Sequence, residues 1–291
     1  MILSTSDSTV IPARSKSTMH IGIETLPTSN SIDVAVLAKR VEELGFESLW
    51  TPDQPVLAAE MADPFPREWG DIVDPLIMLS RASAVTSTIK LGTVVLVVTQ
   101  REPISLAKQV ATLDMYSDGR FIFGIGVGSS PEQAAILGSN FHRRWAECEE
   151  ITQALKALWI EDKSEFHGQY VDFPPVYCFP KPVAKPHPPI LLGSKAKNVF
   201  ERIIYWGNGW IPLDITPEEV HLGRLELDRL ANEAGRDPDS IEITIAGVGP
   251  NKDAIKDYAK AGADRVLVSL ESAPEKASLV ELQKIADSVL T

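Results

Sequence analysis

The sequence predicts an α/β fold, a (β/α)8 TIM barrel with insertion segments, from three observations. Eight short apolar runs rich in β-branched residues alternate with segments of helical periodicity, which is typical of parallel strands joined by helices. The length of 291 residues is near that of one such barrel. The competing doubly wound sheet is disfavoured because the GxGxG run that begins at Gly124 is followed by Ser129 and Pro131, not by the last glycine of a dinucleotide-binding fingerprint.

The elements follow one another as strand and helix along the chain. The expected strands are residues 20–26, 46–51, 89–98, 121–128, 190–192, 209–213, 241–246 and 265–270. The expected helices are residues 31–45, 74–85, 103–116, 131–159 with a break near 138, 196–206, 216–234, 254–261 and 274 onward. The strands are nearly continuous apolar runs, as expected where both faces of a parallel sheet are buried.

Local signals mark the ends of these helices. Ser31 is a plausible N-cap for the first helix, and Gly45 follows its last turn. Asp74 and Pro75 form a cap followed by a first-turn proline, and Pro103 opens the next helix in the same way. These residues predict where helices begin and end.

Two segments are expected to be insertions. Residues 56–72 lack regular periodicity, and a long loop after the carboxyl end of a strand is predicted to be a lid. Residues 165–173 could form a small hairpin outside the main sheet. Residues 1–18 are rich in Ser and Thr and predict a disordered tail, so that residues 19–291 form a single barrel domain. The hypothesis that the tail is dispensable would be refuted if its deletion abolished folding.

Composition and charge narrow the classes of function. The formal net charge of −12 argues against nucleic acids and anionic membrane surfaces as partners. No apolar run is long enough to span a bilayer, and the N-terminus lacks the pattern of a signal peptide, so we expect a cytoplasmic protein. Cys148 and Cys178 have no metal-ligand spacing and are expected to be free thiols.

In a barrel of this kind the chemistry lies at the carboxyl ends of the strands. Neither a GxSxG nor an HExxH motif occurs there, and the histidines form no metal-ligand pair, so we expect no metal site. Four carboxylates are expected at strand ends: Glu24, Asp53, Asp214 and Glu271. They could serve paired acid/base chemistry or cap the helices that follow, and the sequence leaves both open.

An anion site is predicted after the fifth strand. Gly193 and Ser194 end this strand, and Lys195, Lys197 and Arg202 follow at the expected start of a helix. Free backbone N–H groups, a serine cap and nearby cations would hold a phosphate. The alternative is an ordinary capped surface helix. The glycines of FGIGVG also leave two interpretations, tight barrel packing or close approach of a flat ligand to the backbone.

The central strand–helix–strand unit resembles the luciferase-like monooxygenase superfamily, most closely its members that use the deazaflavin coenzyme F420, through LGTVVLVVTQREPISLAKQVATLDMYSDGRFIFGIGVG. Further matching segments are MHIGIETLP, VEELGFESLWTPDQ, FHRRWAECEEITQALKALW, PKPVAKPHPPILLGS, GNGWIP and YAKAGADRVLVSL. They cover most of the chain from Met19 to about Leu270. The resemblance implies a barrel with an insertion and a flavin or deazaflavin across its carboxyl-terminal mouth.

The resemblance also implies site residues. A non-prolyl cis peptide bond between Val94 and Val95 would back the flat ring of the cofactor. The implied cofactor-binding residues are Glu24, Thr93, Val94, Val95, Val127, Gly128, Ser129, Gly193 and Ser194. Asp53 and Gln54, the candidate catalytic residues, would hold the substrate or the edge of the ring.

The chain departs from the family pattern at three places. Gln54 stands where relatives often have a histidine, and an amide cannot act as a general acid. Ser129 and Ser130 stand where some F420-dependent dehydrogenases have a glutamate, and Asn208 replaces the usual aspartate. Hydride transfer needs mainly correct placement of the cofactor, so these departures do not exclude it.

The resemblance leaves three functions to compare. The leading hypothesis is an F420-dependent oxidoreductase that transfers a hydride between the deazaflavin and a small organic substrate. The first alternative is an FMN-dependent two-component monooxygenase, which would need a partner reductase. The second is a non-catalytic flavin- or deazaflavin-binding protein. The extra carboxylates on the F420 tail would be attracted by the positive charges of Lys195, Lys197, Arg143 or Arg144. A homodimer is expected from the resemblance.

Overall fold

The computed structural model describes residues 18–59 and 67–291. The predicted N-terminal tail therefore lies almost wholly outside the described residues, and so does the middle of the predicted lid. Within the described residues, no helix combines the length and the apolar character needed to cross a bilayer. Cys148 and Cys178 are both free, as predicted, and both are buried.

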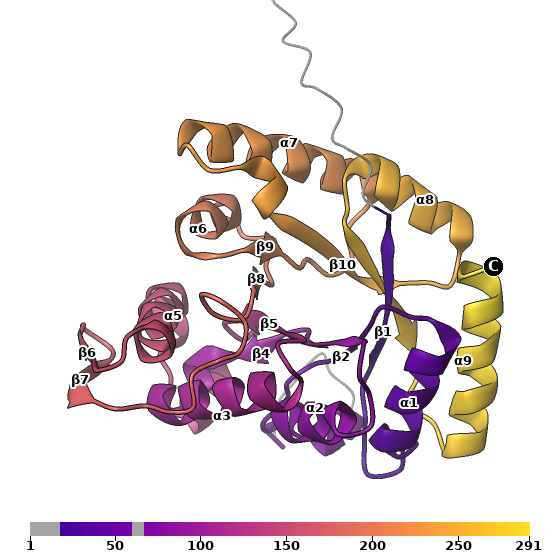
Figure 1. Cartoon of the computed structure of the whole chain (residues 1–291), viewed down its shortest axis with the longest axis horizontal. Coiled ribbons are helices and arrows are strands. Elements are labelled where there is room, and N and C mark those ends of the chain that lie inside the picture. The colour runs from indigo at the N-terminus through magenta and orange to yellow at the C-terminus, as the bar shows by residue number, and fades with distance from the viewer. Residues whose placement is uncertain (1–17, 60–66) are drawn as a thin grey trace, which may run out of the picture.

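The parallel strands close into a barrel, which confirms the predicted fold (Figure 1). They are β1 (His20–Thr25), β2 (Ser48–Thr51), β3 (Lys90–Thr93), β4 (Leu96–Val97), β5 (Phe121–Gly126), β8 (Ile190–Leu192), β9 (Gly209–Trp210), β10 (Glu242–Val248) and β11 (Arg265–Leu270). Their order is β3-β2-β1-β11-β10-β9-β8-β5-β4, and β3 also pairs with β5. Because β3 and β4 both pair with β5, they are two halves of one interrupted strand.

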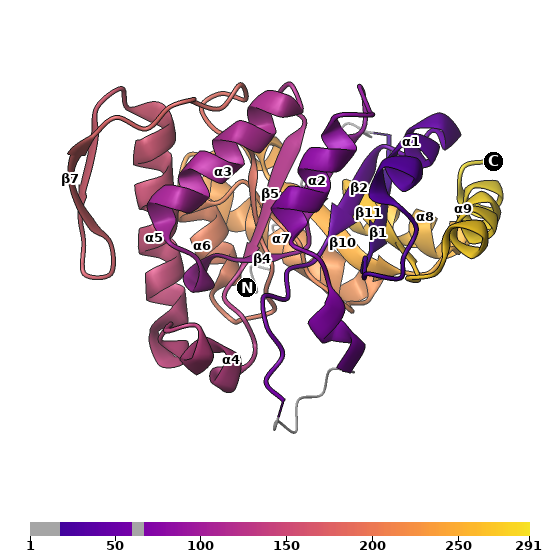
Figure 2. The ribbon, with the colours of Figure 1, turned by 90° about the horizontal axis from the view of Figure 1, so that it is seen from below.

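The helices surround the strands (Figure 1). They are α1 (Val34–Leu44), α2 (Pro75–Ser83), α3 (Pro103–Tyr116), α4 (Pro131–Ile136), α5 (Arg144–Ile160), α6 (Val199–Trp206), α7 (Pro217–Glu233), α8 (Lys252–Ala261) and α9 (Glu275–Val289). Short 3-10 helices are η1 (Arg67–Asp71), η2 (Val98–Gln100), η3 (Phe141–Arg143) and η4 (Pro238–Ser240). Figure 2 shows α4 at the lower edge of the molecule, past the carboxyl end of β5.

The predicted hairpin is confirmed. Strands β6 (Ser164–His167) and β7 (Asp172–Val176) form a separate antiparallel pair, which projects beyond α5 in Figure 2. The Glu150 carboxylate accepts hydrogen bonds from the backbone N–H groups of Tyr170 and Val171, so α5 anchors the hairpin. The hairpin is thus an insertion that leaves the barrel order unchanged.

Four predicted element boundaries are corrected by the structure. The N-cap of α1 is Asp33, whose carboxylate accepts from the Ala35 N–H at 2.8 Å, whereas Ser31 accepts from the Thr28 N–H. The helix predicted from residue 196 begins at Val199. The strand predicted over 89–98 is interrupted after Thr93, and the one predicted over 209–213 keeps regular pairing only to Trp210.

Other local predictions are confirmed. Gly45 ends α1 in the left-handed conformation, and Asp74 caps α2 with Pro75 in its first turn. The long predicted helix is indeed broken near Gly138, which has a positive φ, and becomes α4 and α5. Each of these residues has a local conformational or capping role, so the signal is present in the sequence itself.

The barrel interior has a distinct apolar core beneath its mouth. The buried members of this core are Trp50, Ile122, Leu191, Ile211, Ala246 and Leu267, with Val94 and Val95 packed on it. At the amino ends of the strands, Arg265 forms ion pairs with Glu47 and Glu242. The interior is therefore filled, and open space for a ligand lies at the carboxyl ends of the strands.

Candidate functional site

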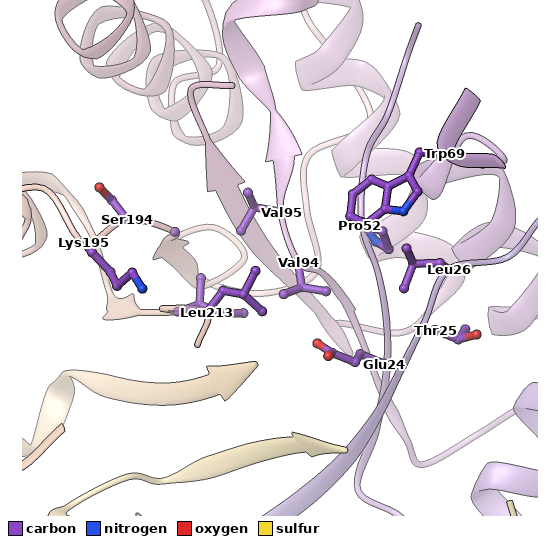
Figure 3. A pocket seen from close by; sticks show the side chains of 12 residues that line it. Glu24, Thr25, Leu26, Pro52, Trp69, Val94, Val95, Ser194, Lys195 and Leu213 are labelled. Atoms are coloured by element: carbon purple, nitrogen blue, oxygen red, sulfur yellow. The ribbon is translucent and has the colours of Figure 1, made fainter. Parts of the chain in front are cut away.

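A cavity of about 330 Å³ opens at the carboxyl ends of the strands. It is lined by Glu24, Thr25, Leu26, Pro52, Trp69, Val94, Val95, Gly193, Ser194, Lys195, Ile211 and Leu213. Figure 3 shows Trp69 and Leu26 on one side, Ser194 and Lys195 on the other, and the two valines between them. Most of these side chains are apolar, and few polar groups converge on the space, as in binding sites for organic ligands.

The floor of the cavity is formed by Val94 and Val95. The peptide bond between them is cis, as the family resemblance implied. It lies between β3 and β4, and both side chains pack against the interior core and line the cavity. The result is a pair of β-branched side chains at the centre of the barrel mouth.

Glycines on neighbouring strands make room for this floor. A Cβ atom at Gly126 would lie 2.5 Å from a methyl group of Val95, and one at Gly193 would lie 2.6 Å from the other methyl group. A Cβ atom at Gly124 would collide with the carbonyl oxygen of Thr93. Of the two interpretations of the FGIGVG glycines, tight packing is therefore confirmed for Gly124 and Gly126.

Glu24 is the acidic side chain of the cavity. It is only 7% exposed, and its Oε1 accepts hydrogen bonds from the Gly247 N–H at 2.8 Å and from the Ser269 hydroxyl at 2.6 Å. Burial raises the pKa of the Glu24 carboxyl above its ordinary value, the two hydrogen bonds oppose this, and the charge of Asp214 adds to it. Within residues 18–59 and 67–291, Glu24 has no ion-pair partner. Of the four predicted strand-end carboxylates, Glu24 is the one that lines this cavity.

The predicted anion site is altered by the structure. Ser194 does not cap α6, because its Oγ accepts from the Ala196 N–H and the helix begins only at Val199. Of the three predicted cations only Lys195 lines the cavity, and its Nζ donates to the carbonyl of Asp214 at 3.0 Å. The guanidinium of Arg202, the arginine among these cations, stacks on the ring of Trp145. The rim therefore offers Ser194 and one lysine.

Asp53 and Gln54 lie outside the main cavity. They line a second, more polar recess of about 290 Å³. The Asp53 carboxylate pairs with the Arg101 guanidinium at 2.8 Å and accepts from the Val97 N–H at 3.1 Å. Burial raises the pKa of Asp53, and these two partners offset that only in part. Gln54 donates to the Gln133 side chain at 3.3 Å. Asp53 is thus held in a buried ion pair with Arg101.

The other predicted cofactor residues fall into two groups. Glu24, Val94, Val95, Gly193 and Ser194 come together around the cavity. Thr93, Val127, Gly128 and Ser129 do not line it. The Thr93 hydroxyl donates to the carbonyl of Gly124 at 2.7 Å, so it fixes the strand that carries the floor.

The lining residues that were not predicted from the sequence include Trp69 and Arg101. Trp69 lies on η1, inside the loop predicted to be a lid, and forms one wall of the cavity. A lone tryptophan in an irregular loop at the barrel mouth was the available signal. Arg101 lies three residues beyond the strand predicted over 89–98. Among the described residues, no cluster of three potential metal ligands occurs.

Comparison with known proteins gives a consistent picture. The sequence profile of the family described as luciferase-like monooxygenase matches residues 15–285. An uncharacterized protein of Mycobacterium tuberculosis is 32% identical over 279 residues, which are 90% of this chain and 96% of that protein. The F420-dependent glucose-6-phosphate dehydrogenase of Kineococcus radiotolerans is 30% identical over 182 residues, which are 61% of this chain and 51% of that enzyme.

Two solved structures share the fold. The monooxygenase RslO1 from Streptomyces bottropensis has a TM-score of 0.80 at 20% identity, covering 94% of this chain and 99% of that chain. The F420-dependent tetrahydromethanopterin reductase from Methanopyrus kandleri has a TM-score of 0.71 at 19% identity, with the same coverage of 94% and 99%.

Proposed function

The chain belongs to the luciferase-like monooxygenase family, and we propose that this oxidoreductase uses coenzyme F420 to transfer a hydride to or from a small, mostly apolar organic substrate. The observation that carries the proposal is the floor formed by Val94 and Val95 at the centre of the mouth. The two branched apolar side chains, with Val95 packed where neighbouring glycines leave room for it, offer a rigid surface on which one face of a planar ring can pack.

The residues present fit a deazaflavin. Apolar side chains form most of the lining, and Trp69 adds a large wall on one side. At the opposite side, Ser194 and Lys195 would meet the anionic part of the cofactor. A bound deazaflavin supplies a hydride donor or acceptor, while the protein binds, orients and excludes water. Because the protein has a net charge of −12, an anionic ligand needs a local positive group, and Lys195 supplies one.

F420 is preferred to FMN because of the named relatives. The sequence relative from Kineococcus radiotolerans is F420-dependent by name, and its match extends over 61% of this chain. The alternative is an FMN-dependent monooxygenase with a partner reductase. It is favoured by the structure of RslO1, a monooxygenase whose TM-score of 0.80 exceeds the 0.71 of the F420-dependent reductase. A non-catalytic cofactor-binding protein is the third candidate, motivated by Gln54 and Ser129.

The proposal is tested by titrating the purified protein with F420 and with FMN and following the fluorescence of each cofactor. We expect F420 to bind at the lower concentration. Reduced F420 would then be mixed anaerobically with a panel of ketones, aldehydes, enones and imines, and its oxidation followed by absorbance. Tighter binding of FMN would favour the monooxygenase. Tight binding of F420 without turnover of any panel member would favour the non-catalytic protein.

The state of assembly and the location are also proposals. We expect a homodimer in the cytoplasm, and a reductase partner only if FMN is the cofactor. Light scattering of the purified protein gives the oligomeric state directly.

A further inference from the structure

We propose that Glu24 is the acid–base residue of the cavity, giving a proton to the substrate as the hydride arrives and taking one back in the reverse direction. This inference rests on the proposed function and deepens it. It assigns the proton transfer to a residue of β1, whereas the candidate catalytic residues predicted from the sequence, Asp53 and Gln54 after β2, were expected to hold the substrate or the edge of the ring.

The geometry of the Glu24 carboxylate supports this role. Both of its hydrogen bonds, from the Gly247 N–H and from the Ser269 hydroxyl, converge on Oε1. Within residues 18–59 and 67–291, no partner is found for Oε2. The side chain lines the cavity, and Figure 3 shows the carboxylate beside Val94. One oxygen is therefore held in place by the barrel, while the other is available to a ligand above the valine floor.

Burial and a neighbouring negative charge favour the protonated form of Glu24. Burial is the main cause that raises the pKa of Glu24, and the exposed carboxylate of Asp214 raises it further. Lys195 also lines the cavity, on the side of Ser194, and is bonded to the carbonyl of Asp214. A further group of charged side chains lies at the amino ends of the strands, where Arg265 pairs with Glu47 and Glu242 and lies against the ring of Trp50.

The other candidates for this proton transfer are less suited. Gln54 does not titrate in the relevant range, and Asp53 is held by Arg101 in the second recess. Asp214 is not among the residues that line the cavity. Among the described lining residues, Glu24 is the one carboxylic acid, and its placement meets the requirement that an acid lie within reach of the reacting group.

The reaction step balances in protons and electrons. The hydride, with its electron pair, is added to the electrophilic carbon of a carbonyl group. The π electron pair moves to the carbonyl oxygen, which takes the proton from Oε2 of Glu24 and becomes a hydroxyl. A bound deazaflavin would supply the hydride with its two electrons, and the substrate would be reduced by those two electrons. Glu24 is left as a carboxylate, which the Gly247 N–H and the Ser269 hydroxyl stabilise.

The substrate class follows from the same arrangement. A cationic substrate would pair with the ionised form of Glu24 and remove the proton donor. An anionic substrate would be repelled once the carboxylate forms. We therefore expect a neutral ketone or aldehyde with a mostly apolar body, or the corresponding alcohol in the reverse direction.

The test compares wild-type protein with Glu24→Gln, Glu24→Asp and the matched control Asp214→Asn. Asparagine tolerates the positive φ of position 214, so the control keeps the fold and removes only a charge. We expect Glu24→Gln to bind F420 within about twofold of wild type but to transfer the hydride about 100-fold more slowly. Glu24→Asp should retain part of the rate, which shows that a carboxyl is required.

The pH profile separates a proton donor from a structural residue. The wild-type rate of carbonyl reduction should fall as Glu24 ionises, the Asp214→Asn profile should be displaced to lower pH, and the Glu24→Gln rate should not follow that ionisation. Infrared difference spectra of the cofactor-free proteins should show a protonated carboxyl that titrates above the ordinary glutamate range and is absent from Glu24→Gln.

The outcomes that overturn the inference differ from those that overturn the function. Turnover by wild type with an equal rate and profile in Glu24→Gln would overturn the role of Glu24 alone. Absence of turnover in wild type would overturn the proposed function. The infrared titration still applies in that case, and a Glu24 carboxyl that ionises in the ordinary range would overturn its assignment as a proton donor.

Discussion

Val95 is the residue on which the cavity depends, because its side chain occupies space that two glycines leave free. We predict that Gly193→Ala weakens cofactor binding and lowers the free energy of unfolding by about 1–3 kcal/mol, since the new methyl group would overlap Val95. Gly249→Ala is the matched control, because nothing lies within 4 Å of its added Cβ. Fluorescence titration and urea unfolding measure both effects. Equal behaviour of the two variants would contradict the packing argument.

A second prediction concerns the stability of the protein as a function of pH, and it can be tested without cofactor. The pKa of Glu24 is raised in the folded protein, so the native state retains a proton that the unfolded state has already lost. Between the ordinary and the raised pKa, wild type should therefore lose stability relative to Glu24→Gln as the pH rises. Below the ordinary pKa the difference should be constant. Thermal unfolding of both proteins across this range is the measurement, and parallel curves would refute the assigned shift.

The limits of sequence reasoning are also visible in single residues. Val94, Val95, Gly193 and Ser194 were predicted for the site and do line the cavity. Asp53 was placed with them because it ends a strand, but a strand end fixes only the position of the backbone. The direction of its side chain depends on Arg101, a partner 48 residues away in the sequence.

At the scale of elements, most helices and strands could be predicted because their signals are local. Apolar runs, prolines in first turns and glycines after last turns identify an element without its neighbours. The start of α6 was misplaced because residues 193–198 after β8 are an irregular turn that no local signal marked. The interruption between β3 and β4 was likewise absent from the apolar pattern, and the family resemblance implied only the cis peptide bond that lies there.

Another prediction concerns the contribution of the 3-10 helix η1 to substrate binding. This helix holds Trp69 against the cavity opposite Lys195 (Figure 3). We expect Trp69→Ala to raise the KM for an apolar substrate about tenfold with a smaller change in kcat, because the lost contact is made in the ground state and the transition state alike. Trp69→Phe keeps a ring in the wall and should remain close to wild type. A loss confined to kcat would argue against this role.

At the scale of the whole molecule, the two ends of the barrel have different tasks. The carboxyl ends carry the cavity, and the amino ends are closed by Arg265 between Glu47 and Glu242. We predict that Arg265→Met lowers the free energy of unfolding by roughly 3–5 kcal/mol, because two partly buried carboxylates lose their partner. Cofactor affinity of the folded fraction should be unchanged. A matching loss of affinity, measured by titration beside the unfolding curve, would show that the ends are coupled.

The proposed function depends above all on a planar redox ring that packs on the two valines at the barrel mouth. A crystal structure of the protein soaked with F420 tests it most directly. We expect the ring to lie against Val94 and Val95, with Glu24 near its reactive edge. Ser194 and Lys195 should lie beside the phosphate of the cofactor. A ring that occupies the recess beside Asp53 and Arg101 and leaves the barrel mouth empty would contradict the proposed function.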